Sequence, residues 1–212
     1  MGTSADIHDI RTLQDRQQVL LSELQHRTRN LLSLVQAIAR QTIKSSTSLS
    51  EFSAQFESRL AALSRVQGVL AHTDHGPIKL EQIVRGELDA HGADRSVQIG
   101  GPDVELPPNA AQSLALAIHE LATNAVKYGA LSQQSGTLQV TWSLRENDLD
   151  NLVKLEWRET GVSLPSGKPA RRGYGRELIE RALPYQLDAV TRFELAADGV
   201  RCSVELPLGR AK

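Results

Sequence analysis

The sequence predicts an α+β protein in which an N-terminal antiparallel helical hairpin precedes helices packed on a mostly antiparallel sheet. Two observations support this fold class. The first third of the chain repeats apolar residues at helical spacing over two long stretches. The remainder alternates helical patterns with period-two patterns joined by polar turns. The change falls in the polar segment 72–77, so we predict a first domain at residues 1–76 and a second at residues 77–212.

Each of the first two helices is predicted from a single apolar stripe. The first helix, about residues 9–44, carries Leu20, Leu24, Leu31, Val35 and Ile38. The Ser/Thr-rich segment 45–50 interrupts the pattern and offers N-caps for a second helix that ends near Thr73. The stripe of that second helix comprises Phe52, Phe56, Leu60, Leu63 and Leu70. Neither helix can bury its stripe alone, so we predict a hairpin that a second chain could complete to a four-helix bundle.

The second domain is predicted element by element from the change in periodicity. Helices are expected over residues 80–90, 109–128 and 174–187. Strands are expected over residues 96–99, 137–144, 152–158, 191–195 and 201–206, with polar turns at 146–151 and 198–199.

Charge and composition exclude several classes of protein. Lys and Arg total 24 against 25 Asp and Glu, so the chain lacks the basic surplus of a nucleic-acid-binding protein. The single cysteine, Cys202, cannot form an internal disulfide and suits a reducing compartment. No apolar run approaches the roughly 20 residues that span a bilayer, so a cytoplasmic location is expected.

His26 is the candidate nucleophile of the first helix. It shares a polar face with Glu23, Arg27 and Asn30, at spacings of three, four and seven residues within that set. An imidazole in water is largely neutral near pH 7, so one ring nitrogen is available to attack phosphorus. From geometry alone, a surface histidine on a charged helix face is the favoured interpretation.

The helix at residues 109–128 carries a second set of polar residues. Its predicted inward face comprises Leu114, Ile118, Leu121, Ala125 and Tyr128. Glu120, Asn124 and Lys127 follow on a neighbouring face at spacings of four and three. A carboxylate, an amide and an ammonium group on one ridge suit a magnesium triphosphate, although a solvated polar face has the same pattern.

Two glycine turns add candidate phosphate contacts. Gly161 follows a predicted strand, and Gly173 and Gly175 precede a predicted helix. Backbone amides at such turns can bind phosphate oxygens, but a lone Gly-x-Gly usually marks only a tight loop.

Together these motifs resemble the HWE-type histidine kinases. The segment 23–32, ELQHRTRNLL, is similar to the phosphoacceptor block of that family. The segment 119–132, HELATNAVKYGALS, resembles its asparagine box almost letter for letter. His119, Trp157 and Glu159 match the residues that name the family, and the segment 172–175 resembles its second glycine box. The resemblance runs in order from residue 20 to residue 207.

The resemblance implies a dimerisation and phosphotransfer hairpin followed by an ATP-binding domain of the GHKL type. His26 would accept the phosphoryl group, and Asn124 would ligate Mg²⁺. Glu120 would bind Mg²⁺ through water or polarise the acceptor, and Lys127 would contact phosphate. Glu159 would read adenine beside Gly161, while Gly173 and Gly175 would form a hinge beside the triphosphate.

The resemblance also implies partners. A response-regulator receiver domain would take the phosphoryl group, and two copies of the chain would form a homodimer. Residues 6–10, DIHDI, resemble the exit from a PAS sensor domain, so we expect a PAS-like sensor upstream that this chain lacks.

One departure from the family pattern, and one from the pattern of ordinary histidine kinases that the family shares, leave alternatives open. The family usually continues from Gly161 with Gly and Pro, whereas Val162 and Ser163 stand here, so the adenine loop could fit nucleotide less well. Arg27 takes the place of the acid that follows the acceptor in many histidine kinases, which leaves Glu23 as only a candidate base. The alternatives are therefore a phosphotransfer scaffold with a degenerate nucleotide domain and, last, a GHKL ATPase without a phosphohistidine.

Overall fold

The computed structural model describes residues 3–72, 76–92, 97–146, 151–162 and 173–208, and gives only the backbone for residues 3–13, 15, 20, 23, 27 and 146. The chain forms two compact units, residues 1–56 and residues 57–212. The unit boundary falls inside the second helix, whereas the domain boundary predicted from the change in sequence pattern lies at residue 76 and stays a prediction. Among the described residues, no helix combines the length and apolar character needed to cross a membrane.

The first unit consists of α1 (Thr3–Ser45) and the beginning of α2 (Leu49–His72). The turn between the helices is a variant of the capping box, in which Glu51 bonds the residue before the N-cap Ser48. Ser48 Oγ accepts a hydrogen bond from the Glu51 amide at 3.1 Å, and the Glu51 carboxylate accepts one from the Thr47 amide at 2.7 Å. The predicted Ser/Thr N-cap is therefore confirmed, and it ends one helix and begins the next within four residues.

The apolar stripe of α1 is only partly buried. Ile38 is fully buried, whereas Leu24 is 61% exposed. Leu20 lies outside the described side chains. Burial therefore follows the predicted stripe only toward the C-terminal end of the helix.

The second unit is built on a five-stranded sheet with the order β2–β4–β5–β7–β6. The strands are β2 (Val97–Gly100), β4 (Thr137–Glu146), β5 (Asn151–Thr160), β6 (Val190–Ala196) and β7 (Gly199–Pro207). β2 pairs with β4 in parallel, and the other three pairs are antiparallel. The mostly antiparallel sheet predicted from the sequence is confirmed.

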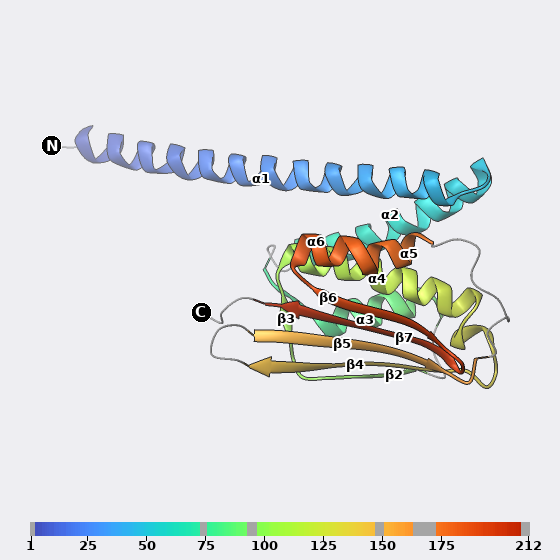
Figure 1. The fold of residues 1–212 in the computed structure, drawn as a ribbon. Coiled ribbons are helices and arrows are strands. Elements are labelled where there is room, and N and C mark those ends of the chain that lie inside the picture. The colour runs from blue at the N-terminus through green and yellow to red at the C-terminus, as the bar shows by residue number, and fades with distance from the viewer. Residues whose placement is uncertain (1–2, 73–75, 93–96, 147–150, 163–172, 209–212) are drawn as a thin grey trace. The chain divides into compact units, whose positions relative to one another are not determined.

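Helices gather on one face of this sheet (Figure 1). They are α3 (Leu80–Asp89), α4 (Pro108–Lys127) and the helical segment formed by α5 (Tyr174–Glu177), a π-helical turn (Leu178–Ala182) and α6 (Leu183–Leu187). The part of α2 from Glu57 onward belongs to the same unit and buries Ala62, Leu63, Val66 and Leu70. The main core lies between this helical layer and the inward side chains of the sheet.

Strand β5 shows how the sheet aims side chains at the core. Its buried residues alternate strictly: Val153, Leu155, Trp157 and Glu159. Because successive side chains on a strand point to opposite faces, the carboxylate of Glu159 continues the buried row. The last inward position of β5 is thus an acid, which places a buried charge next to the C-terminal end of α4.

Helix α1 begins at Thr3, several residues before the predicted start near residue 9, and three further differences from the sequence prediction lie in the second unit. Tyr128 is 67% exposed, because α4 ends at Lys127 and the residue no longer follows the helical stripe. The short strands β1 (Ile78–Lys79) and β3 (Glu105–Leu106), which pair with each other, and the 3-10 turn Ala130–Ser132 were not predicted. The helix predicted at 174–187 contains a π turn beside Pro184, which has no amide hydrogen for the regular helical bond.

Candidate nucleotide site

The predicted polar ridge of α4 lies on one side of the helix, but its members differ in exposure. Glu120 is 8% exposed, whereas Asn124 and Lys127 are exposed. The Asn124 carbonyl accepts hydrogen bonds from the amides of Tyr128 and Gly129, which closes the helix immediately after Lys127. An ammonium group in the last turn also suits the negative end of the helix dipole. The ridge therefore runs from a buried carboxylate to an exposed amide and a cation.

Glu120 is held by a residue that the sequence analysis missed. Arg59 of α2 donates from Nε to Glu120 Oε1 at 2.7 Å and from Nη2 to Oε2 at 3.3 Å. Arg59 follows Phe56 by three residues and precedes Leu63 by four, so it sits in the apolar stripe of α2. A charged residue in an apolar stripe was the available signal that a buried partner exists.

Glu159 accepts two hydrogen bonds in the core of the second unit. Its Oε1 accepts from Trp157 Nε1 at 2.9 Å, and its Oε2 accepts from the Ala130 amide at 2.8 Å. Burial raises the pKa of Glu159, while these two hydrogen bonds act in the opposite direction. Gly129 lies so close that a Cβ there would collide with Glu159 Oε2. The carboxylate thus joins the end of β5 to the turn that follows α4.

The three glycines predicted to contact phosphate differ in their backbone conformation and in their surroundings. Gly161 adopts a φ of +72°, and a Cβ there would collide with the carbonyl oxygen of Ser135. Gly173 is exposed just before α5, where nothing crowds it. Gly175 is buried, and a Cβ there would lie 2.7 Å from the Cβ of Glu120. Gly175 therefore brings α5 against the α4 ridge.

Val162 follows Gly161 where the resembled family usually has glycine. It is 3% exposed, and its amide donates to the Asp198 carbonyl at 3.1 Å. Ser163, Arg171 and Arg172 lie outside the described residues. Val162 therefore places a buried side chain just after the end of β5, where glycine would have none.

His119 is the centre of a buried polar cluster between α2, α3 and α4. Its Nδ1 lies 3.1 Å from Glu87 Oε2, and its Nε2 lies 2.9 Å from Ser58 Oγ. Because a carboxylate can only accept, Nδ1 carries the proton and Nε2 accepts from the hydroxyl in the neutral ring. Sequence reasoning identified His119 only as a signature residue, whereas the structure shows it joining three helices.

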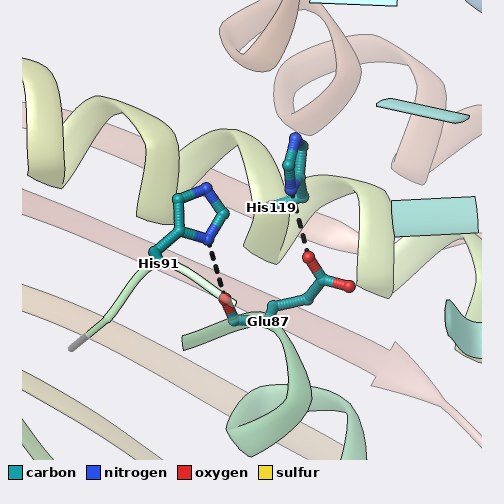
Figure 2. Close-up of side chains that lie close together, drawn as sticks. All are labelled: Glu87, His91 and His119. Carbon is teal, nitrogen blue, oxygen red and sulfur yellow. Dashed lines mark hydrogen bonds and ion pairs between the residues drawn. The ribbon is translucent and has the colours of Figure 1, made fainter. Parts of the chain in front are cut away.

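The same cluster contains three groups of the types that ligate metals, Glu87, His91 and His119 (Figure 2). However, Arg65 Nε already donates to Glu87 Oε1 at 3.1 Å, and Nη2 contacts Oε2. Burial raises the pKa of Glu87, but the hydrogen bonds and charges of His119 and Arg65 outweigh it and hold that pKa below its ordinary value. The carboxylate is thus neutralised by a guanidinium, and we infer no metal there.

His26 belongs to the other unit. It is exposed on α1, and its Nδ1 lies 3.4 Å from Asn30 Nδ2, one helical turn away. The ring nitrogen that this contact does not involve is Nε2. The predicted neighbours Glu23 and Arg27 lie outside the described side chains.

Comparison with known proteins adds three findings. The family model described as HWE histidine kinase matches residues 23–103. Blue-light-activated histidine kinases from Brucella anthropi and Brucella abortus are each 30% identical to this chain, over 210 and 211 residues. Each match covers 98% of this chain but only 43% of the relative, so the chain spans less than half the length of these curated relatives.

Among solved structures, the fold resembles the blue-light-activated histidine kinase of Erythrobacter litoralis. The TM-score is 0.60 at 20% identity, and the match covers 89% of this chain and 59% of that one. The isolated histidine kinase domain of that protein gives a TM-score of 0.55 at 16% identity, covering 83% and 94%. These likenesses confirm the predicted GHKL-type fold.

Proposed function

We propose that this chain, which matches the HWE histidine kinase family model over residues 23–103 and is 30% identical to a histidine kinase of Brucella anthropi, is an ATP-dependent protein-histidine kinase that phosphorylates His26. The observation that carries the proposal is the α4 ridge, where exposed Asn124 and Lys127 continue from the buried carboxylate of Glu120. These groups match what a nucleotide triphosphate needs, namely oxygen ligands for a hard cation and a positive charge for phosphate.

The residues of the second unit fit a magnesium nucleotide by the chemistry of their side chains. Asn124 and Glu120 offer the oxygen ligands, directly or through water, and bound Mg²⁺ would neutralise phosphate charge. Lys127 would contact phosphate. Glu159 uses one lone pair of each oxygen for Trp157 and Ala130, so further acceptor sites remain for an adenine amino group. Gly161 and Gly175 permit close approach of neighbouring segments, and Gly173 leaves open space just before α5.

The proposed chemical step balances without a further reagent. A ring nitrogen of His26 forms a bond to the γ-phosphorus while the bond from that phosphorus to the β,γ-bridging oxygen breaks and ADP leaves. The other ring nitrogen gives up its proton to a carboxylate, for which Glu120 and Glu23 are the candidates. Catalysis then depends on positioning and charge neutralisation.

The phosphoryl group would pass from His26 to an aspartate of a response-regulator receiver domain. The labile N–P bond suits such a relay. A homodimer stays a prediction from the family resemblance, an upstream PAS-like sensor one from residues 6–10, and a cytoplasmic location one from the composition of the chain. The relatives are named for activation by blue light, which concerns those longer proteins.

One observation favours a second candidate function. Val162 replaces the usual glycine with a buried side chain at the end of β5, next to the proposed adenine contact. A chain with a weakened adenine loop would act as a phosphotransfer scaffold, which receives phosphoryl groups but does not take them from ATP.

Incubation with γ-labelled ATP and Mg²⁺ tests the proposal. We expect a label on the intact chain that acid removes and base does not, and that His26→Ala lacks. A matched variant, His72→Ala, replaces an exposed histidine of α2 and should keep the label. A label that persists in His26→Ala contradicts the assignment of the acceptor, and an intact chain that takes no label favours the scaffold.

A further inference from the structure

Two consecutive residues of α2 bind two consecutive residues of α4. Ser58 contacts His119 through its hydroxyl at 2.9 Å, and Arg59 contacts Glu120 through Nε at 2.7 Å. All four residues belong to the unit 57–212, so these contacts are internal to one compact body. The second helix of the proposed phosphotransfer hairpin therefore contributes directly to the wall of the proposed nucleotide site.

The ion pair between Arg59 and Glu120 is buried on both sides. Their side chains are 6% and 10% exposed. A carboxylate in such surroundings depends on its cation, because water cannot replace the lost solvation. The pair also has a defined geometry, since the planar guanidinium donates to both carboxylate oxygens from two nitrogens.

Two residues of α5 hold this pair in place. The guanidinium carbon of Arg59 lies 4.1 Å from the centre of the Tyr174 ring, within the range of a cation–π contact. Burial, together with the charge of Glu120, raises the pKa of Tyr174 to about 12, so the ring stays neutral. Gly175 lies against the Glu120 side chain on the adjoining side. The carboxylate is thus confined by α2 and α5 as well as by its own helix.

We propose that Arg59 is a positioning residue that orients the Glu120 carboxylate for phosphoryl transfer; this inference rests on the proposed kinase function. Arg59 uses one acceptor site on each carboxylate oxygen, and a carboxylate offers about four. Arg59 does not use the remaining acceptor sites of the carboxylate. These sites can accept a hydrogen bond from a metal-bound water or from the imidazole N–H of His26. The orientation of these sites is set by α2, outside α4 itself.

Three variants of the full chain test this role. Arg59→Met keeps the length of the side chain but removes the charge and both donors, while Arg59→Lys keeps the charge without the planar fork. Arg65→Met is the matched control, because Arg65 lies on the same helix and pairs in the same two-nitrogen manner with another buried carboxylate, Glu87. The readouts are the initial rate of phosphohistidine formation at saturating Mg·ATP and the Kd for a non-hydrolysable ATP analogue with Mg²⁺.

We expect Arg59→Met to lower the rate at saturating Mg·ATP by about tenfold or more, because a misoriented Glu120 carboxylate no longer supports phosphoryl transfer. The Kd for the analogue should change by a clearly smaller factor than the rate, since Asn124, Lys127 and Glu159 remain. Arg59→Lys should recover part of the rate, and Arg65→Met should stay within about threefold of the intact chain once the folded fraction is measured by circular dichroism.

Several results would overturn the proposal. A rate for Arg59→Met equal to or above that of the intact chain means that Arg59 does not present Glu120. Equal losses of rate and analogue affinity, or an equal loss in Arg65→Met, mean that the residue only maintains the fold. If Arg59→Met does not fold, a full rate in Arg59→Lys overturns the role of the fork. Absence of label from the intact chain instead removes the kinase function itself.

Discussion

Replacing Glu159 by Gln removes one acceptor from a pair of buried hydrogen bonds. The carboxylate accepts from Trp157 Nε1 at 2.9 Å and from the Ala130 amide at 2.8 Å, and it is only 2% exposed. A glutamine side chain has one acceptor oxygen, so in either orientation its NH₂ group faces one of these two donors. The substitution preserves the shape of the side chain while leaving one buried N–H without an acceptor.

The expected loss of stability follows from this geometry. A hydrogen bond to a charged group contributes about 1.5–3 kcal/mol, and removing one partner exposes the cost of the unsatisfied donor. Burial raises the pKa of Glu159, which means that the fold disfavours the ionised form, so a neutral amide recovers part of the loss. We therefore expect Glu159→Gln to lower the free energy of unfolding by about 1–3 kcal/mol at pH 8.

Urea denaturation followed by tryptophan fluorescence measures this loss. The chain has two tryptophans, Trp142 and Trp157, and both are buried in the unit 57–212, so the signal reports on the unit that contains Glu159. A loss of this size shifts the urea midpoint by roughly 0.5–1 M. The matched control is Glu156→Gln on the same strand, where the side chain is 55% exposed and pairs with Lys154. The control should change stability by less than about 0.5 kcal/mol, as surface pairs do.

Equal midpoints for the two variants would refute the assignment of Glu159 as the acceptor that joins β5 to the turn after α4. An additional outcome concerns the proposed function. If Glu159 also reads adenine, Glu159→Gln should weaken binding of an ATP analogue, while Glu156→Gln should leave it unchanged.

Two further predictions concern the same unit. Gly129→Ala places a Cβ against Glu159 Oε2 and should destabilise the unit by about 2 kcal/mol or more. The control Gly86→Ala meets nothing within 4 Å in the middle of α3 and should stabilise the unit by about 0.5–1 kcal/mol. A stability for Gly129→Ala at or above that of the intact chain would contradict the close packing. Burial lowers the pKa of His91 below its usual 6.5, although its hydrogen bond to the Glu87 carbonyl acts in the other direction. The unfolded chain then takes up a proton before the folded chain does, so stability is complete above about pH 6.5 and falls as the pH drops toward the folded pKa. His91→Gln should therefore lose less stability than the intact chain between pH 7.5 and 5.5 in urea titrations, and identical losses would show that His91 does not titrate as described.

The sequence predicted the elements of the second unit well because their periodicity is local. The buried row of β5 and the inward face of α4 follow directly from spacings of two and of three to four residues. The same spacing placed Glu120, Asn124 and Lys127 on one ridge. Local patterns were therefore sufficient to identify the face of α4 on which we place the nucleotide.

The contacts that hold the site together were not predictable in this way. Arg59 and Glu120 are 61 residues apart, and so are Ser58 and His119. Periodicity predicts which face of a helix is buried, but it does not predict which distant side chain that face contacts. A charge in the apolar stripe of α2 indicated only that Arg59 needs a buried partner. The exposure of Tyr128 was also missed. The end of α4 depends on the approach of Gly129 to Glu159, and Glu159 lies on strand β5, far from α4 in the sequence.

A calorimetric titration of the intact chain with a non-hydrolysable ATP analogue and Mg²⁺ tests the nucleotide site most directly. We predict a measurable heat of binding at one site per chain, together with at least a tenfold loss of affinity in Asn124→Ala, which removes an exposed amide from the α4 ridge. Absence of binding heat from the folded intact chain, or full affinity in Asn124→Ala, would contradict the nucleotide site proposed on α4.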